Sequence, residues 1–65
     1  MMEGPNHILK YFEYAHLPPV LQEVSKPFHE LAHLMVNSLP AGSERSAGLR
    51  KLLEAKDCCV RAALG

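Results

Sequence analysis

Apolar residues recur at steps of three and four along most of the chain, and no segment shows the two-residue alternation of a strand. Prolines and glycine interrupt this pattern at Pro18-Pro19 and again at 40–42. Such residues punctuate helices, so the pattern predicts three helical segments and an all-α fold.

The first segment, predicted over 6–14, is short. It places Ile8, Leu9 and Phe12 in one stripe, which Ala15 extends. A helix of this length is marginal by itself, so it needs another element to pack against.

Pro18-Pro19 suits the start of the second segment, because the first helical turn does not use its N–H groups. Pro27 leaves two possibilities: it kinks one continuous helix, or it lies in the first turn of a new helix capped by the Ser25 hydroxyl. We favour the second. The expected buried stripe of this helix is Phe28, Leu31, Ala32, Met35 and Leu39.

The third helix is predicted to begin near Ser43 and to run almost to the end of the chain. A short loop between two such helices predicts an antiparallel helical hairpin, with the short N-terminal helix packed across it. The expected apolar side, which Lys56 interrupts, consists of Leu49, Leu52, Leu53, Val60, Ala63 and Leu64.

The length of 65 residues predicts a single domain over 1–65, and an isolated monomer of this size would be marginally stable. Disulfides, a metal or oligomerisation stabilise such chains. Cys58 and Cys59 are adjacent and cannot join distant segments, so we expect reduced thiols. The apolar stripes exceed what one hairpin can bury, which predicts assembly as a homo-oligomer.

Seven basic and seven acidic residues cancel, so no overall field attracts DNA or RNA duplexes or an anionic membrane. The sequence contains no apolar run of the roughly 20 residues that a membrane span requires. No secretory signal is recognised, and we expect a cytoplasmic protein that holds any anionic ligand locally.

The segment His29-Glu30-Leu31-Ala32-His33 matches H-E-x-x-H, in which two histidines bind zinc and the glutamate polarises a metal-bound water. A zinc hydrolase also needs a third ligand and a cleft. The alternative, which we favour, places both histidines beside the apolar stripe at a helix or subunit boundary. No metal or cofactor is therefore expected.

Tyr11 and Lys26 are candidate ligand contacts. An aromatic face can stack a nucleobase, and an ammonium near the start of a helix can meet a phosphate. The alternative is a core tyrosine and a solvated lysine. On the third helix, Arg61 could pair with Asp57 and, repeated around an oligomer axis, would create a positive site. The other basic side chains of this helix, expected on a solvated face, are Arg45, Arg50, Lys51 and Lys56.

Several segments resemble the phage anti-CBASS protein two family. The likeness covers nearly the whole chain, and its most specific block is SAGLRKLLEAKDC over 46–58. The other matching segments are 5–12, 16–18 and 24–28.

The resemblance implies a non-enzymatic sponge in the host bacterial cytoplasm, assembled as a homohexamer, that sequesters cyclic dinucleotides such as 3′,3′-cGAMP and also cyclic trinucleotides. Family dinucleotide sites use an aromatic residue and a lysine at positions that match Tyr11 and Lys26. Ser25, which precedes Lys26, is also expected to contact the ligand. Arg61 is the candidate residue for the separate trinucleotide site. The alternatives are a zinc hydrolase using His29, Glu30 and His33, and a helical protein-interaction module.

Overall fold

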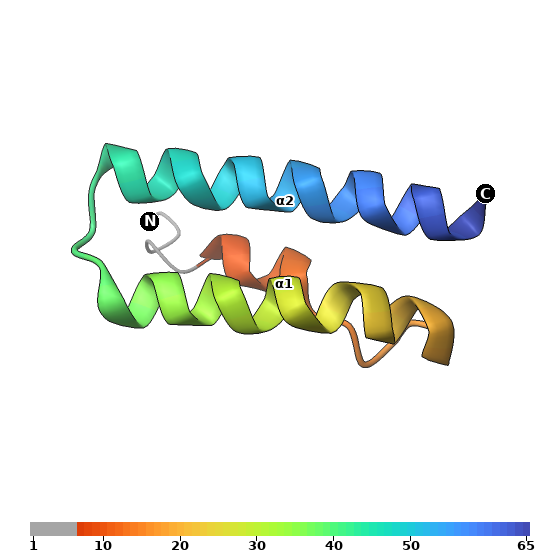
Figure 1. The fold of residues 1–65 in the computed structure, drawn as a ribbon. Coiled ribbons are helices and arrows are strands. Elements are labelled where there is room, and N and C mark those ends of the chain that lie inside the picture. The colour runs from red at the N-terminus through yellow and green to blue at the C-terminus, as the bar shows by residue number, and fades with distance from the viewer. Residues whose placement is uncertain (1–6) are drawn as a thin grey trace.

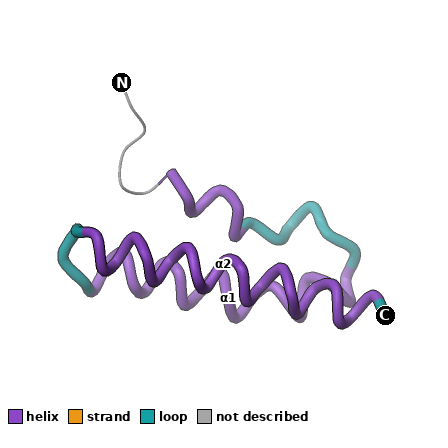
Figure 2. Tube along the Cα trace, turned by 90° about the horizontal axis from the view of Figure 1, so that it is seen from above, coloured by secondary structure: helices purple, strands orange, loops and turns teal. Residues whose placement is uncertain are grey.

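The computed structural model describes residues 7–65, and this part of the chain contains three helices and no strand. The 3-10 helix η1 covers His7–Phe12, and the α-helices α1 and α2 cover Pro19–Ser38 and Ser43–Leu64. The helices α1 and α2 run antiparallel and are joined by the loop 39–42 (Figure 1). To one side of this hairpin lies η1, which contacts both long helices (Figure 2). The predicted all-α hairpin with a short helix across it is confirmed.

The helix η1 differs from the predicted first helix in where it ends and in its hydrogen bonding. Residue 6, where the first helix is expected to begin, lies outside the described residues. The helix ends at Phe12, before the expected end at 14, and its 3-10 hydrogen bonding differs from that of an α-helix.

The prediction that a new helix begins at Pro27 is wrong, because α1 runs through this proline without a break. The helix begins after Pro18, with Pro19 in its first turn and no side chain capping it. Ser25 is fully buried inside the helix and therefore does not cap it. The helical turns before Pro27 place Leu21 and Ser25 in the interior. This packing offsets the free-energy cost of the backbone hydrogen bond that the proline removes.

The core lies where the three helices meet, and each helix supplies one fully buried apolar residue: Phe12, Ala32 and Leu49. Five positions expected on the apolar stripes are exposed instead: Ala15, Leu31, Leu39, Ala63 and Leu64. The partly buried side chains packed against the core are Ile8, Leu9, Phe28, Met35, Val36, Leu52 and Leu53.

Arg45, expected on a solvated face, is instead buried at the turn end of the hairpin. Its Nη1 donates hydrogen bonds to the carbonyl oxygens of Val36, at 3.1 Å, and Leu39, at 2.9 Å. Carbonyls at the end of a helix have no partner inside the helix. The guanidinium therefore closes the C-terminal end of α1 and ties it to the first turn of α2.

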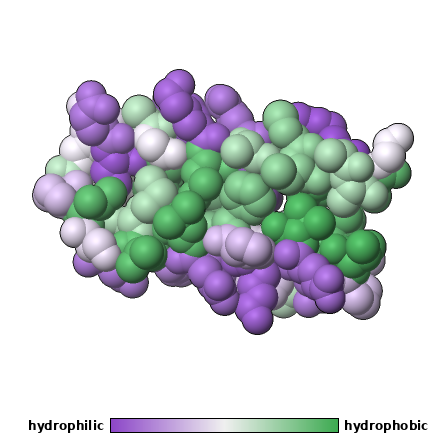
Figure 3. All heavy atoms as spheres, in the orientation of Figure 1, coloured by the Kyte–Doolittle hydropathy of each residue, from purple (hydrophilic) through white to green (hydrophobic). Residues whose placement is uncertain are grey.

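An apolar surface remains on the described chain. Val20, Leu31 and Leu34 are exposed on α1, at spacings that repeat along one side of a helix. Figure 3 shows apolar side chains in a band along the molecule, with polar side chains along both edges. None of the helices described over 7–65 has the length and apolar character needed to cross a bilayer.

Candidate functional site

A groove of about 320 Å³ lies between η1, the connector that follows it and the C-terminal half of α2. We call it the Tyr11 groove. One aromatic ring, three lysine or arginine side chains, one histidine and two carboxylates line it. Its lining residues are Lys10, Tyr11, Glu13, His16, Leu17, Lys56, Asp57, Val60 and Arg61.

The Tyr11 side chain is half exposed in this groove, at 50% of its full accessible area, so it is not a core residue. The Lys10 ammonium lies 5.2 Å from the centre of its ring. The His7 ring meets the same ring edge-on, with 6.3 Å between centroids. An accessible aromatic ring next to cations can stack a base while a phosphate is held close by.

Lys56 holds the backbone of Tyr11 in place. Its Nζ donates a hydrogen bond of 2.6 Å to the Tyr11 carbonyl oxygen and lies 3.6 Å from an oxygen of Asp57. The side chain is only 12% exposed. Sequence reasoning did not assign this role, although the interruption of the apolar stripe at Lys56 was a signal for it.

Arg61 lies in the Tyr11 groove and is exposed. Its Nη2 donates to the Cys58 sulfur at 3.4 Å, a weak hydrogen bond. The predicted pair with Asp57 is not formed, because that carboxylate faces Lys56 instead. Among residues 7–65, no carboxylate lies within ion-pair distance of Arg61, so its guanidinium remains available for an anion.

Lys26 lies in a different hollow, of about 410 Å³, together with Tyr14 and Glu23. The structure therefore does not bring Tyr11 and Lys26 into one groove of a single chain. Ser25 is fully buried, and its hydroxyl has no hydrogen-bond partner. Lys26 is exposed and accessible to a ligand, whereas the buried Ser25 is not.

His29 and His33 lie on one side of α1, with 4.4 Å between their ring centroids. His29 Nδ1 lies 3.2 Å from the Phe12 carbonyl oxygen and donates to it, because a carbonyl can only accept. The Tyr14 ring packs edge-on against His29 at 5.0 Å. Over the described residues, no three His, Cys, Asp or Glu side chains are grouped so that they could share a metal ion.

Comparisons of the chain with protein-family models, with curated protein sequences and with solved structures find no match.

Proposed function

We propose that this protein binds cyclic dinucleotides such as 3′,3′-cGAMP, and cyclic trinucleotides as further ligands, and sequesters them without cleaving them. In this role it would act as a phage sponge against CBASS signalling in the host bacterial cytoplasm. The observation that carries the proposal is the Tyr11 groove, where a half-exposed aromatic ring lies among basic side chains in a chain of zero net charge.

The groove offers both kinds of contact that a cyclic dinucleotide requires. Its bases can stack on the Tyr11 ring, a contact worth about 1–3 kcal/mol per base in single-strand binders. Its phosphodiesters can accept charge-assisted hydrogen bonds from Arg61 and Lys10, which line the same groove. Sequestration needs binding alone, so no nucleophile or activated water enters the mechanism.

Tyr11 and Lys26 line different hollows of one chain. A ligand that contacts both residues in one site therefore requires two subunits, one supplying Tyr11 and the other Lys26. A homohexamer, which the resemblance implies, can contain two-fold and three-fold axes that suit cyclic di- and trinucleotides. The exposed stripe of Val20, Leu31 and Leu34 offers apolar surface for such contacts.

Ligand recovery tests the proposal directly. The protein is mixed with 3′,3′-cGAMP, separated from free ligand and heat-denatured, and the released nucleotide is analysed by chromatography. Intact ligand in the protein fraction supports sequestration. Linear product would indicate a nuclease, and no bound ligand would overturn the proposal.

Calorimetry with variants tests the assigned residues. Tyr11→Ala and Lys26→Ala should each weaken binding at least tenfold, about 1.4 kcal/mol, without changing the oligomer. Tyr11→Phe keeps the ring, and Lys51→Ala removes an exposed lysine of α2 outside the grooves, so both should bind normally. Unchanged affinity in both alanine variants would refute the site.

Two alternative functions have their own tests. A zinc hydrolase would use the neighbouring His29 and His33 with Glu30, and metal analysis of untagged protein would detect the bound zinc. A protein-interaction module would use the exposed apolar stripe. A monomer without affinity for any cyclic nucleotide would favour this module over the sponge.

A further inference from the structure

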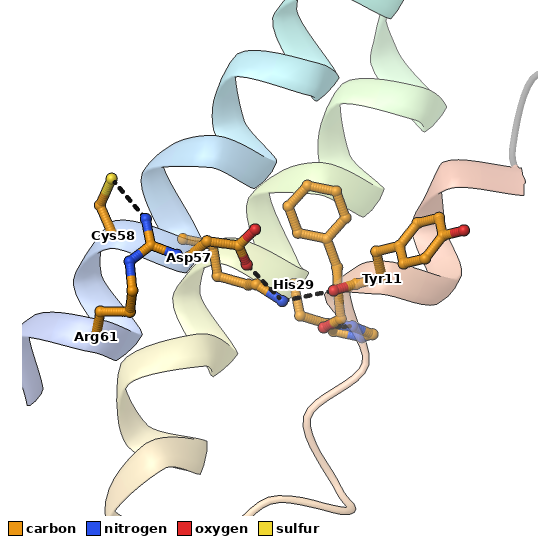
Figure 4. Close-up of polar contacts among 7 residues, drawn as sticks. Tyr11, His29, Asp57, Cys58 and Arg61 are labelled. Carbon is orange, nitrogen blue, oxygen red and sulfur yellow. Dashed lines mark hydrogen bonds and ion pairs between the residues drawn. The ribbon is translucent and has the colours of Figure 1, made fainter. Parts of the chain in front are cut away.

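Two consecutive carbonyl groups at the end of η1 are each held by a different long helix. The Tyr11 carbonyl accepts a 2.6 Å hydrogen bond from Lys56 of α2, and the Phe12 carbonyl accepts one of 3.2 Å from His29 of α1. Figure 4 shows Tyr11 on η1 near His29 of α1, with a dashed line at the Tyr11 carbonyl oxygen that marks its hydrogen bond. We call this pair of contacts the clasp.

The surroundings of Lys56 show that this lysine is not an ordinary surface side chain. It is 12% exposed, whereas the neighbouring Asp57 is 50% exposed. Its ammonium lies 5.9 Å from the centre of the Phe12 ring, beside the core. A charged donor in a partly buried position makes a stronger hydrogen bond than a neutral one, so the contact with Tyr11 is suited to fixing the backbone.

The six residues of η1 need such external contacts. A short 3-10 helix has poor internal hydrogen bonding, and its last carbonyls have no partner within the helix. The Tyr11 side chain extends from the Cα atom next to the carbonyl of the same residue, and the backbone conformation at that atom limits the χ1 rotamers of the side chain. Fixing the carbonyls of Tyr11 and Phe12 therefore restricts the directions that the Tyr11 ring can take.

We propose that Lys56 and His29 are positioning residues that hold Tyr11 in its ligand-binding orientation. The inference rests on the proposed function, because it assumes that the Tyr11 ring contacts the nucleotide. Lys56 also lines the Tyr11 groove, and the effect assigned to it here comes from the hydrogen bond that it donates to the Tyr11 backbone. Without the clasp, the Tyr11 ring occupies its ligand-binding orientation in only a fraction of the molecules. The apparent affinity for the ligand is then reduced in proportion to that fraction.

The experiment compares Lys56→Met with Lys51→Met and Lys56→Arg. Methionine keeps an unbranched apolar stem over Phe12 but removes the donor. Lys51 is an exposed lysine of the same helix and provides the matched control. Arginine restores a charged donor. Hydrogen–deuterium exchange of η1 is measured without ligand, and calorimetry measures the affinity for 3′,3′-cGAMP.

In Lys56→Met we expect faster exchange confined to η1 and an affinity about tenfold weaker, which corresponds to about 1.4 kcal/mol. Lys51→Met should change neither quantity, and Lys56→Arg should restore most of both. His29→Phe, which keeps a ring against Tyr14 and His33 but lacks the N–H donor, should also accelerate exchange in η1.

Unchanged exchange of η1 in both Lys56→Met and His29→Phe overturns the clasp. Faster exchange spread over α1 and α2, or failure of both Lys56→Met and Lys56→Gln to fold, also overturns it, because Lys56 is then a general stability residue. The hydrogen–deuterium exchange measurement requires no ligand. If wild-type protein does not bind 3′,3′-cGAMP, the proposed function fails, while the exchange pattern still decides whether the clasp holds η1.

Discussion

The buried hydroxyl of Ser25 gives the sharpest stability prediction. This side chain is fully buried within α1, and its Oγ has no hydrogen-bond partner. Replacement by alanine removes the unpaired group and keeps the Cβ. We therefore expect Ser25→Ala to be more stable than the wild-type protein.

The magnitude follows from three contributions. An unsatisfied buried polar group costs about 1–3 kcal/mol. Alanine adds about 0.5 kcal/mol of helix propensity relative to serine. Loss of the packing of the hydroxyl oxygen opposes these gains by an amount close to that of one methylene, about 0.8 kcal/mol. The net expectation is a free energy of unfolding raised by about 0.7–2.7 kcal/mol. Each kcal/mol corresponds to a Tm about 4–8 °C higher in a domain of this size.

Thermal unfolding followed by circular dichroism provides the measurement. All samples are kept at one protein concentration, because the Tm of a protein that oligomerises depends on concentration. Ser46→Ala is the matched control, since Ser46 is an exposed helical serine of α2 and reports helix propensity alone. A Tm increase no larger than that of the control, or a decrease, would refute the reasoning. Binding of 3′,3′-cGAMP should be unchanged in Ser25→Ala, in contrast to the sequence-based assignment of Ser25 as a ligand contact.

Two further substitutions test features of the hairpin. Pro27→Ala should raise the urea midpoint of unfolding, because a proline inside a helix destabilises it by about 3 kcal/mol. The proline also stiffens the unfolded chain, but this stabilises the protein by only about 0.4–1 kcal/mol. A lower midpoint would show that the proline has a favourable role in the native state. Arg45→Met keeps an apolar stem but loses both hydrogen bonds to the end of α1, and should lower the free energy of unfolding by about 1.5–3 kcal/mol. An unchanged denaturation midpoint in Arg45→Met would contradict the closing role of this guanidinium.

The fold was largely predictable because proline and glycine mark both interruptions. The start of α1 at Pro19 and of α2 at Ser43 follows from these residues and from the helical period. The prediction failed at Pro27, where local chemistry favours a helix start but tertiary packing on both sides keeps the helix continuous. Leu31, assigned to the buried stripe, is exposed because the buried side of α1 follows Leu21, Ser25 and Ala32.

The candidate site was only partly predictable. Tyr11 and Arg61 were recognised as single candidates, but their shared groove depends on the path of the connector after η1. Gln22 holds this connector, with hydrogen bonds to the carbonyls of Leu17, at 2.7 Å, and Ala15, at 3.3 Å. A contact such as that between Lys56 and Tyr11 joins residues 45 positions apart, and no local pattern encodes it.

The turn of the hairpin has a practical consequence for labelling. The loop 39–42 is exposed and joins the helices at one end of a molecule 35 Å long, whereas the Tyr11 groove involves the far half of α2. A fluorophore attached through an Ala41→Cys substitution would therefore lie away from the Tyr11 groove and would not obstruct it. Both native thiols would first have to be replaced, since Cys58 and Cys59 are exposed and would compete for the dye.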